Sequence, residues 1–148
     1  MNKGSDEKAE LFIDVNIFID VLEKRSNWQS SFALLNAVRD HKISGCVSSL
    51  TVAIIYFLRR QSLSDKQARK DVRDSIEGFK VVDVSQNDTL EALSDERFSD
   101  FEDALQFYYA RDKSRTIITR NKRDFARITD KIGVLSPEEF LKQFGQDS

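Results

Sequence analysis

Short apolar runs alternate with longer amphipathic segments along this chain, and no other feature constrains the fold as strongly. The apolar runs predict strands at residues 11–13, 43–47, 79–84, 116–119 and 133–134. Because parallel strands require long crossover connections, strands that alternate with helices indicate a parallel sheet with helices on both faces. We therefore predict an α/β fold, a three-layer α/β/α sandwich with a central parallel sheet of four to five strands.

The segments between these strands carry apolar residues at helical spacing. Asn16 lies where an N-cap would begin the first helix, and Gly78 ends the helix that starts near Ser64. The other predicted helices cover residues 27–40, 50–60, 87–94, 100–111, 122–128 and 137–144.

The composition of the chain limits the kinds of catalytic and metal site that it can form. The chain has 148 residues, a formal charge of -2 and 40% hydrophobic residues, which is typical of one globular domain. We expect a flexible polar arm at residues 1–10 and a single domain at residues 11–145. Cys46 is the one cysteine and His41 the one histidine, so an internal disulfide and a Cys/His zinc site are excluded and the acid-base chemistry must come from carboxylates. No apolar run approaches the roughly 20 residues that span a bilayer, so we expect a cytoplasmic protein with no membrane partner.

Three aspartates should meet at one edge of the predicted sheet. Asp14 ends the first strand, Asp103 lies in the first turn of the helix before the fourth strand, and Asp124 follows that strand. In parallel α/β units, strands end and the connecting helices begin at the same edge, where ligands bind. Carboxylates that share a cleft repel one another unless a cation lies among them. Mg²⁺ or Mn²⁺ suits oxygen ligands and can activate water for attack on a phosphodiester.

A second interpretation of these acids stays open. An aspartate at a strand end often serves as a turn or cap residue, and acids at residues 100–103 suit a helix N-terminus without any ligand. The pattern is compatible with a metal site and equally with a charged rim that binds nothing. In a metal site, four nearby polar residues would orient waters or ligands: Asn16, Asp20, Thr119 and Asn121.

Four motifs follow one another along the chain: FIDVNIFID at 12–20, DFED at 100–103, IITRNKRDF at 117–125 and VLSPEEFL at 134–141. In this order they resemble the PIN domain family, and within it the VapC-type toxins of toxin–antitoxin pairs. The resemblance covers nearly the whole chain, from about Leu11 to Phe144. It implies a parallel sheet flanked by helices and a ribonuclease activity that depends on Mg²⁺ or Mn²⁺.

The resemblance also assigns roles to residues. Asp14, Asp103 and Asp124 match three of the four acids of the family site, as catalytic residues and metal ligands. Asp100 is an additional candidate ligand, because it lies three residues before Asp103 on the same helix. The family's common supporting positions match Asn16, Asp20, Thr119 and Asn121.

The remaining acid of the family site is where this chain departs from the pattern. The family usually carries Ser-x-Leu-Thr-x-x-Glu after the second strand, and here that pattern starts at Ser48 and ends with Ile54 in place of the glutamate. An apolar residue there removes a ligand and leaves an apolar wall at the cleft. The other acids then hold one metal more weakly, or Glu102 or Asp100 compensates, or the protein is a catalytically inactive PIN-like module that binds RNA or a protein partner.

Charge is unevenly distributed along the chain. Residues 83–103 hold eight acids and one base, whereas residues 111–131 hold eight bases and three acids. The basic segment could hold RNA phosphates beside the last aspartate of the site, although it could also be a solvated face. The RNA-binding candidates are the three bases of the loop at the predicted active edge: Arg120, Lys122 and Arg123.

Two protein partners are implied by the resemblance: a cognate antitoxin, bound in a groove of the early helices, and a second copy of the chain in a homodimer. Five aromatic residues are candidates for these surfaces, although aromatic residues at helical spacing are also typical of a core. They are Phe18, Trp28, Phe32, Tyr56 and Phe57.

Overall fold

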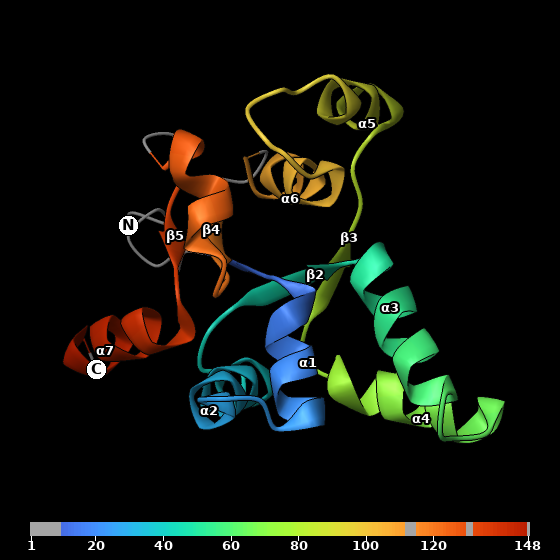
Figure 1. The fold of residues 1–148 in the computed structure, drawn as a ribbon. Helices are drawn as coiled ribbons and strands as arrows, with labels where there is room; N and C mark the ends of the chain where they lie inside the picture. The colour runs from blue at the N-terminus through green and yellow to red at the C-terminus, as the bar shows by residue number, and fades with distance from the viewer. Residues whose placement is uncertain (1–9, 112–114, 130–131, 148) are drawn as a thin grey trace, which may run out of the picture.

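One parallel sheet forms the centre of the molecule (Figure 1). The computed structural model describes residues 10–111, 115–129 and 132–147, so nearly all of the predicted arm lies outside the described residues. The sheet order is β3-β2-β1-β4-β5, and every pair of neighbours is parallel. The strands are β1 (Leu11–Ile13), β2 (Gly45–Ser48), β3 (Lys80–Val82), β4 (Thr116–Ile118) and β5 (Val134–Leu135). The predicted parallel sheet is confirmed, with five strands in the described chain.

Helices connect the strands, as the amphipathic segments predicted. They are α1 (Val15–Glu23), α2 (Trp28–Arg39), α3 (Ser49–Arg60), α4 (Asp65–Ser75), α5 (Gln86–Leu93), α6 (Phe101–Arg111) and α7 (Pro137–Asp147). The predicted helix at 122–128 is present as the 3₁₀ helix η2 (Lys122–Ile128). None of the described helices is long and apolar enough to cross a membrane.

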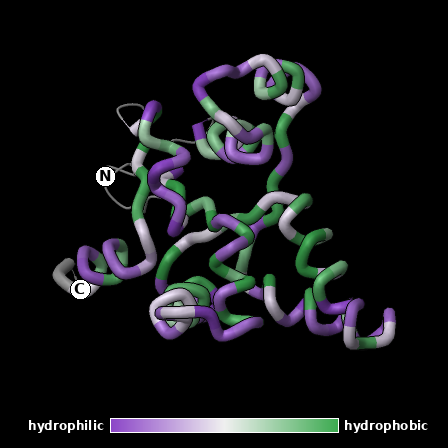
Figure 2. The backbone as a smooth tube through the Cα atoms, viewed as in Figure 1, coloured by the Kyte–Doolittle hydropathy of each residue, from purple (hydrophilic) through white to green (hydrophobic). Residues whose placement is uncertain are grey.

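The strands present alternate residues to two faces, which builds a core on each side of the sheet. Phe12 of β1 pairs with Cys46 and Ile117 of the neighbouring strands, and all three belong to the core under α5, α6 and η2. Ile13 and Ile118, one residue further along, belong to the opposite core with residues of α1, α2 and α3. Figure 2 shows hydrophobic stretches running through the central strands. The three-layer sandwich is therefore confirmed.

Most element bounds differ from the prediction by one to three residues, and two of these differences have a clear physical cause. The N-cap of α1 is Asp14, whose extended backbone (φ -63°, ψ 141°) leads into the helix and whose side chain accepts the backbone N–H of Asn16. The prediction of Asn16 as the cap was wrong, because aspartate and asparagine are equally good N-caps and only the backbone conformation separates them. The second strand covers Gly45–Ser48 rather than 43–47, because the N–H of Ile43 bonds the carbonyl of Ala37 in the turn after α2.

Gly78 was predicted to end the helix itself, but α4 ends at Ser75 with Ile76 as its C-cap, and Gly78 lies in the turn that follows. Its φ of 88° lies in the left-handed region, and a Cβ there would lie 2.9 Å from the Cα of Arg39. Only glycine adopts this conformation without a clash, so the chain can turn here into β3.

Candidate active site at the carboxyl edge of the sheet

Asp14 lies at the carboxyl edge of the sheet, directly after the central strand β1, and its side chain contacts three elements of the fold. Its side chain is 2% exposed and caps α1 directly after β1. The hydroxyl of Thr119, at the end of β4, donates to Asp14 Oδ2 at 2.9 Å. From α6, Gln106 Nε2 donates to Asp14 Oδ1 at 3.3 Å. These contacts join residues about 100 positions apart in the chain, so the topology brings together what the sequence separates.

Burial raises the pKa of Asp14, although hydrogen bonds from Thr119, Asn16 and Gln106 oppose the shift. Desolvation disfavours the charged form of a carboxyl group, whereas donated hydrogen bonds favour it. In the absence of a cation, the carboxyl group therefore keeps its proton to a higher pH than a solvated aspartate does.

The pKa of Asp103 is raised as well. This residue lies in the first turn of α6 and is 9% exposed. Burial raises its pKa to about 7, and the charges of Glu102, Asp124, Asp100 and Asp14 act in the same direction. The structure thus brings Asp14, Asp103 and Asp124 into one electrostatic environment. Asp124 itself is exposed, on η2.

Glu102 and Gln106, both on α6, lie next to these aspartates. Glu102 is half-buried, and burial followed by the charge of Asp14 raises its pKa. Gln106 is 4% exposed, and its Nε2 also donates to Glu102 Oε2 at 2.6 Å. Gln106 Oε1 is buried without a hydrogen-bond partner in the described chain. Sequence reasoning missed Gln106, whose one signal was its position four residues after Glu102 on a helix face.

Asp100 lies at the outer end of the cluster. Its side chain is exposed and accepts the backbone N–H of Glu102 at 2.9 Å, as a capping residue does at the start of a helix. Its charge contributes to the raised pKa values of Glu102 and Asp103. Asp100 is therefore near the site, with one carboxylate oxygen already engaged.

The chemistry of these side chains fits a hard divalent cation. As the side chains stand, no group of three acids, histidines or cysteines in the described chain converges closely enough to hold a metal ion. The potential donors are nevertheless all oxygens, burial and neighbouring acids raise the pKa of Asp103 together, and the carbonyl oxygen of Gln106 is unpartnered. A Mg²⁺ or Mn²⁺ ion would offset this repulsion and prefers carboxylate and carbonyl oxygens.

The predicted supporting residues divide into two groups. Thr119 and Asn16 bond Asp14 directly, and the backbone N–H of Asn121 donates to Thr119 Oγ1 at 3.0 Å. Asp20 instead accepts the Ser31 hydroxyl at 3.0 Å, away from these contacts. The structure therefore places Thr119, Asn16 and Asn121 at the site and gives Asp20 a different partner.

Besides Ser31, Asp20 binds the side chain of Arg120. Its Nε donates to Asp20 Oδ2 at 2.6 Å, and its terminal nitrogens reach Glu138 Oε1 of α7 at 2.8 Å and the carbonyl of Asn27 at 2.8 Å. In the described chain the donors of Arg120 bind the protein itself, and its role as an RNA-binding side chain stays a prediction. Arg120 is a positioning residue that fastens the loop before Asp124 to α1, α2 and α7.

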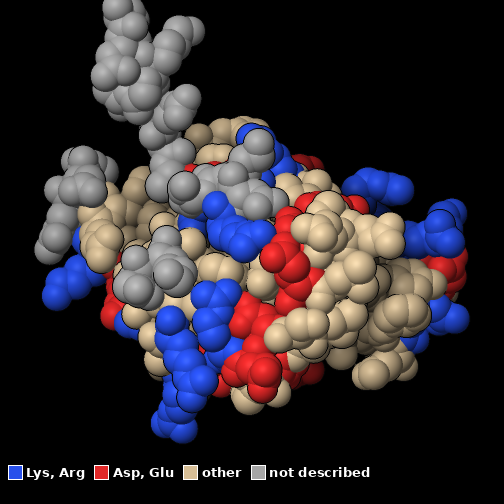
Figure 3. Space-filling view, turned by 90° about the horizontal axis from the view of Figure 1, so that it is seen from above, with Lys and Arg blue, Asp and Glu red and all other residues tan. Residues whose placement is uncertain are grey.

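The other two predicted RNA-binding bases are exposed. Lys122 Nζ lies 2.8 Å from both carboxylate oxygens of Glu139 on α7. Arg123 lines a pocket beside Asp124. In the space-filling view from above, Lys and Arg side chains gather beside a band of Asp and Glu side chains (Figure 3). Residues of the basic and acidic segments meet at this pocket, because Glu96 and Arg97 line it together with Arg123 and Arg127.

Ile54 is partly buried on α3 and packs against the core on the α1 side of the sheet. Thr51, one turn earlier, accepts the Ser48 hydroxyl at 3.1 Å, and Ser48 caps the helix through the backbone N–H of Thr51. Ser48 therefore caps the start of α3, and an apolar side chain lies where the resemblance predicts a glutamate.

A family model described as the PIN domain matches residues 10–123. This chain is a PIN domain. The match includes β1 through the start of η2, and so it includes Asp14 and Asp103 but ends one residue before Asp124. The resemblance predicted from the motifs is confirmed at the level of the family.

Several solved structures similar to this PIN domain come from toxin–antitoxin complexes. A chain of a toxin–antitoxin complex from Klebsiella pneumoniae is 25% identical, with a TM-score of 0.63 over 86% of this chain and 97% of that one. A chain of DNA-bound VapBC from Salmonella typhimurium is 18% identical, with a TM-score of 0.66 over 87% and 98%. A chain of VapBC2 from Rickettsia felis, bound to a promoter DNA fragment, is 17% identical, with a TM-score of 0.64 over 84% and 96%. No functionally curated protein matches this PIN domain.

Proposed function

We propose that this PIN domain is a cytoplasmic ribonuclease of the VapC type, the toxin of a toxin–antitoxin pair, which hydrolyses RNA phosphodiesters with the help of Mg²⁺ or Mn²⁺. The observation that carries the proposal is that five acids, the buried Asp14 among them, gather at one edge of the sheet; burial and the charges of the other four raise the pKa of Asp103. A protein rarely gathers like charges at the ligand-binding edge of a parallel sheet unless a cation joins them.

Asp14, Asp103 and Asp124 would hold the ion. When bound, the ion supplies positive charge that lowers the pKa of a water molecule and stabilises the charge developing on the phosphodiester. Thr119 and Gln106 fix the orientation of the Asp14 carboxylate through their hydrogen bonds. Near neutral pH the Asp103 carboxyl group exchanges its proton readily, and a nearby cation favours its release.

Glu102 is the better candidate to compensate for Ile54. It is half-buried, its pKa is raised by burial and by Asp14, and Gln106 links it to Asp14. Asp100 is exposed and already caps the start of α6. The loss of the family glutamate is therefore expected to weaken metal binding while leaving Asp14, Glu102, Asp103 and Asp124 as the acids of the site.

A second candidate function is a catalytically inactive module that binds RNA or a protein. Ile54 favours it, and so does the Gln106 amide group, whose Nε2 occupies the space between Asp14 and Glu102 and bonds both. In that case the amide group replaces the cation as the partner of the two carboxylates.

Metal titration separates the two functions. We expect calorimetry with millimolar Mn²⁺ to give binding heat for the wild type and none for Asp14→Asn or Asp103→Asn. Asparagine is nearly isosteric and remains a good N-cap, so Asp14→Asn should preserve α1. Asp40→Asn, at an exposed position after α2, is the matched control and should bind Mn²⁺ as the wild type does. Equal heats in all four proteins would exclude the proposed metal site.

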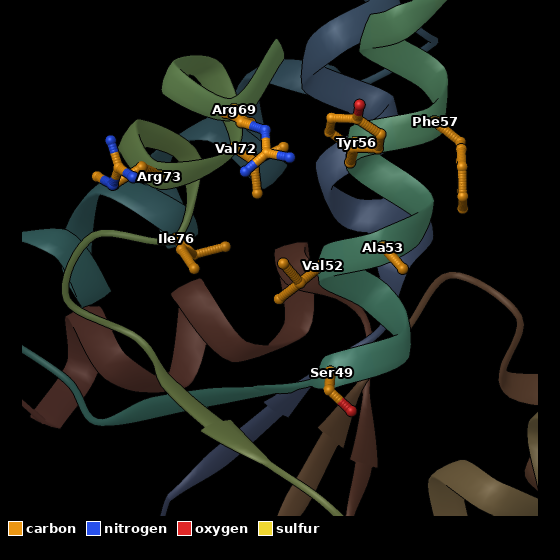
Figure 4. A pocket seen from close by; sticks show the side chains of 9 residues that line it. All are labelled: Ser49, Val52, Ala53, Tyr56, Phe57, Arg69, Val72, Arg73 and Ile76. Carbon is orange, nitrogen blue, oxygen red and sulfur yellow. The ribbon is translucent and has the colours of Figure 1, made fainter. Parts of the chain in front are cut away.

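The proposed antitoxin would occupy a groove of about 510 Å³ between α3 and α4 (Figure 4). Apolar side chains form its walls, and Phe57 at its edge is 67% exposed. Arg69 and Arg73 lie on the α4 side. We propose that a partner segment with apolar residues flanked by acids binds here, because it would cover the apolar walls and pair with Arg73, whereas Arg69 is ion-paired with Asp65 at 2.8 Å.

The predicted aromatic residues differ in their exposure to solvent. Phe18 is 2% exposed and belongs to the core, whereas Phe57 and Phe32 are 67% and 45% exposed. For the proposed homodimer, Leu90 and Leu93 lie one turn apart on α5 and are 55% and 60% exposed, a surface that a second copy would cover. Light scattering on the purified protein tests the dimer, which Leu93→Glu should dissociate.

A further inference from the structure

A second pocket, of about 360 Å³, opens beside Asp124 between η2 and the segment that leads from α5 to α6. Besides Asp124, its charged lining consists of three arginines and one glutamate: Arg97, Arg123, Arg127 and Glu96. The pocket is therefore built from cations directly beside a candidate metal ligand, in contrast to the apolar groove between α3 and α4.

The geometry of η2 explains why these side chains face one way. In a 3₁₀ helix, residues three apart lie on the same face. Phe125 and Ile128 form the inner face and are 0% exposed. Asp124 and Arg127 are likewise three apart, so the acid and the base stand side by side on the outside. The pair results from the helix geometry, which also places Arg123 at the pocket.

The three arginines differ in how they are held. Arg97 is fixed by a bidentate ion pair with Asp95, at 2.9 and 2.7 Å, and its guanidinium lies 4.9 Å from the ring centre of Phe107. Arg123 and Arg127 are exposed, and within the described residues neither has an ion pair or a hydrogen bond through its side chain. Their charges are thus available to a ligand, unlike those of Arg120 and Lys122.

We propose that this pocket binds a phosphate group of single-stranded RNA, the one next to the phosphodiester that lies at Asp124, with Arg123 and Arg127 as its ligands and Arg97 as a fixed wall. The inference rests on the proposed function, since Asp124 marks where the reacting phosphodiester lies. Guanidinium groups bind phosphate oxygens through paired hydrogen bonds, and their fixed charge offsets the repulsion between RNA and the acidic cluster.

The lining favours RNA over an acidic protein segment. Apart from Ala126 and the arginine stems, the pocket offers no apolar side chain to anchor a peptide, whereas a phosphate needs none. Glu96 and Asp124 oppose anions and leave the lining with a formal charge of +1, which suits a single phosphate rather than a run of acidic residues.

A charge-matched pair of variants tests the pocket. The test variant carries Arg123→Gln with Arg127→Gln, and the control carries Lys66→Gln with Lys142→Gln, two exposed bases on α4 and α7. Both lose two positive charges, and all four positions are exposed, so the fold should be retained. Binding of a short fluorescein-labelled single-stranded RNA is measured by anisotropy in EDTA over a series of salt concentrations, so that no cleavage is needed.

We expect the test variant to bind the RNA about tenfold more weakly and the control to bind as the wild type does. The slope of log Kd against log salt should fall by about 0.7, the value for one contact to a single-stranded phosphate. Equal weakening in both variants would show only a general charge effect and overturn the pocket. Unchanged RNA binding in the test variant, with loss of binding to a polyglutamate peptide, would assign the pocket to a protein instead.

The result of the RNA-binding experiment does not depend on whether the proposed metal site exists. If Mn²⁺ gives no heat but the test variant alone loses RNA binding, the proposed nuclease fails and the phosphate pocket stands. If Mn²⁺ binds and RNA is cleaved while the test variant binds RNA normally, the nuclease stands and the pocket fails.

Discussion

Replacing Asp103 with asparagine should stabilise the metal-free protein, although it removes a proposed metal ligand. The pKa of Asp103 is raised from its usual value of 3.8 to about 7, so the folded state binds this proton more tightly than the unfolded state does. A folded state that gains protons loses stability as the pH rises between the two values. Stability from this group is thus fully present below about pH 4 and lost by about pH 7.

The size of the effect follows from the shift. At about 1.4 kcal/mol per pKa unit, ionising Asp103 in the folded protein costs up to about 4 kcal/mol, and we expect about 2 kcal/mol after the site relaxes and water enters. Asparagine carries no charge at any pH and so avoids this cost. For a chain of this length, about 2 kcal/mol raises the melting temperature by about 4–8 °C.

Thermal unfolding in a chelating buffer at about pH 8 and about pH 4 measures this difference. Asp103→Asn should melt higher than the wild type at the higher pH and close to it at the lower pH, while Asp40→Asn follows the wild type at both. Added Mn²⁺ should raise the melting temperature of the wild type and leave that of Asp103→Asn unchanged. A variant that is less stable than the wild type at about pH 8 would refute the electrostatic account of the cluster.

Three further predictions concern other parts of the molecule. Ile54→Glu should restore an acid at the cleft and tighten Mn²⁺ binding by calorimetry about tenfold or more, with a gain in RNA cleavage; no change would point to a wider loss of the site. Arg120→Gln should lower the free energy of unfolding in urea by about 3 kcal/mol, because it leaves Asp20 buried without its cation; a loss below about 1 kcal/mol would mean that the network is not stabilising. Phe57→Glu should weaken capture of the cognate antitoxin in a pull-down without changing the melting temperature, since the side chain is 67% exposed; undiminished capture would exclude the groove between α3 and α4.

The fold was readable from the sequence because its signals are local and repeated. The run from Leu11 to Ile13 predicted β1 with its bounds, and the alternation of strands and helices predicted a parallel sheet and hence which ends of the strands meet. That topology also sufficed to bring Asp14 and Asp103 to one edge.

The features that were missed depend on tertiary contacts. A count of basic residues cannot show that Arg120 points inward, because its carboxylate partner Asp20 lies 100 residues earlier in the chain. Gln106 carries no charge and belongs to no recognisable pattern, and only packing against β1 places its amide group on Asp14. The cap of α1 was misplaced by two residues because the choice between Asp14 and Asn16 depends on backbone dihedral angles.

Arg120 and Lys122 both bind acids at the start of α7, through Glu138 and Glu139. The family match ends at residue 123, so a truncation designed from that boundary alone would discard the last helix. Such a shortened protein would lose both ion pairs between α7 and the loop before Asp124. It would also expose the core residues that α7 covers. A shortened protein that is expected to keep the shape of its acidic edge must therefore include the C-terminal helix.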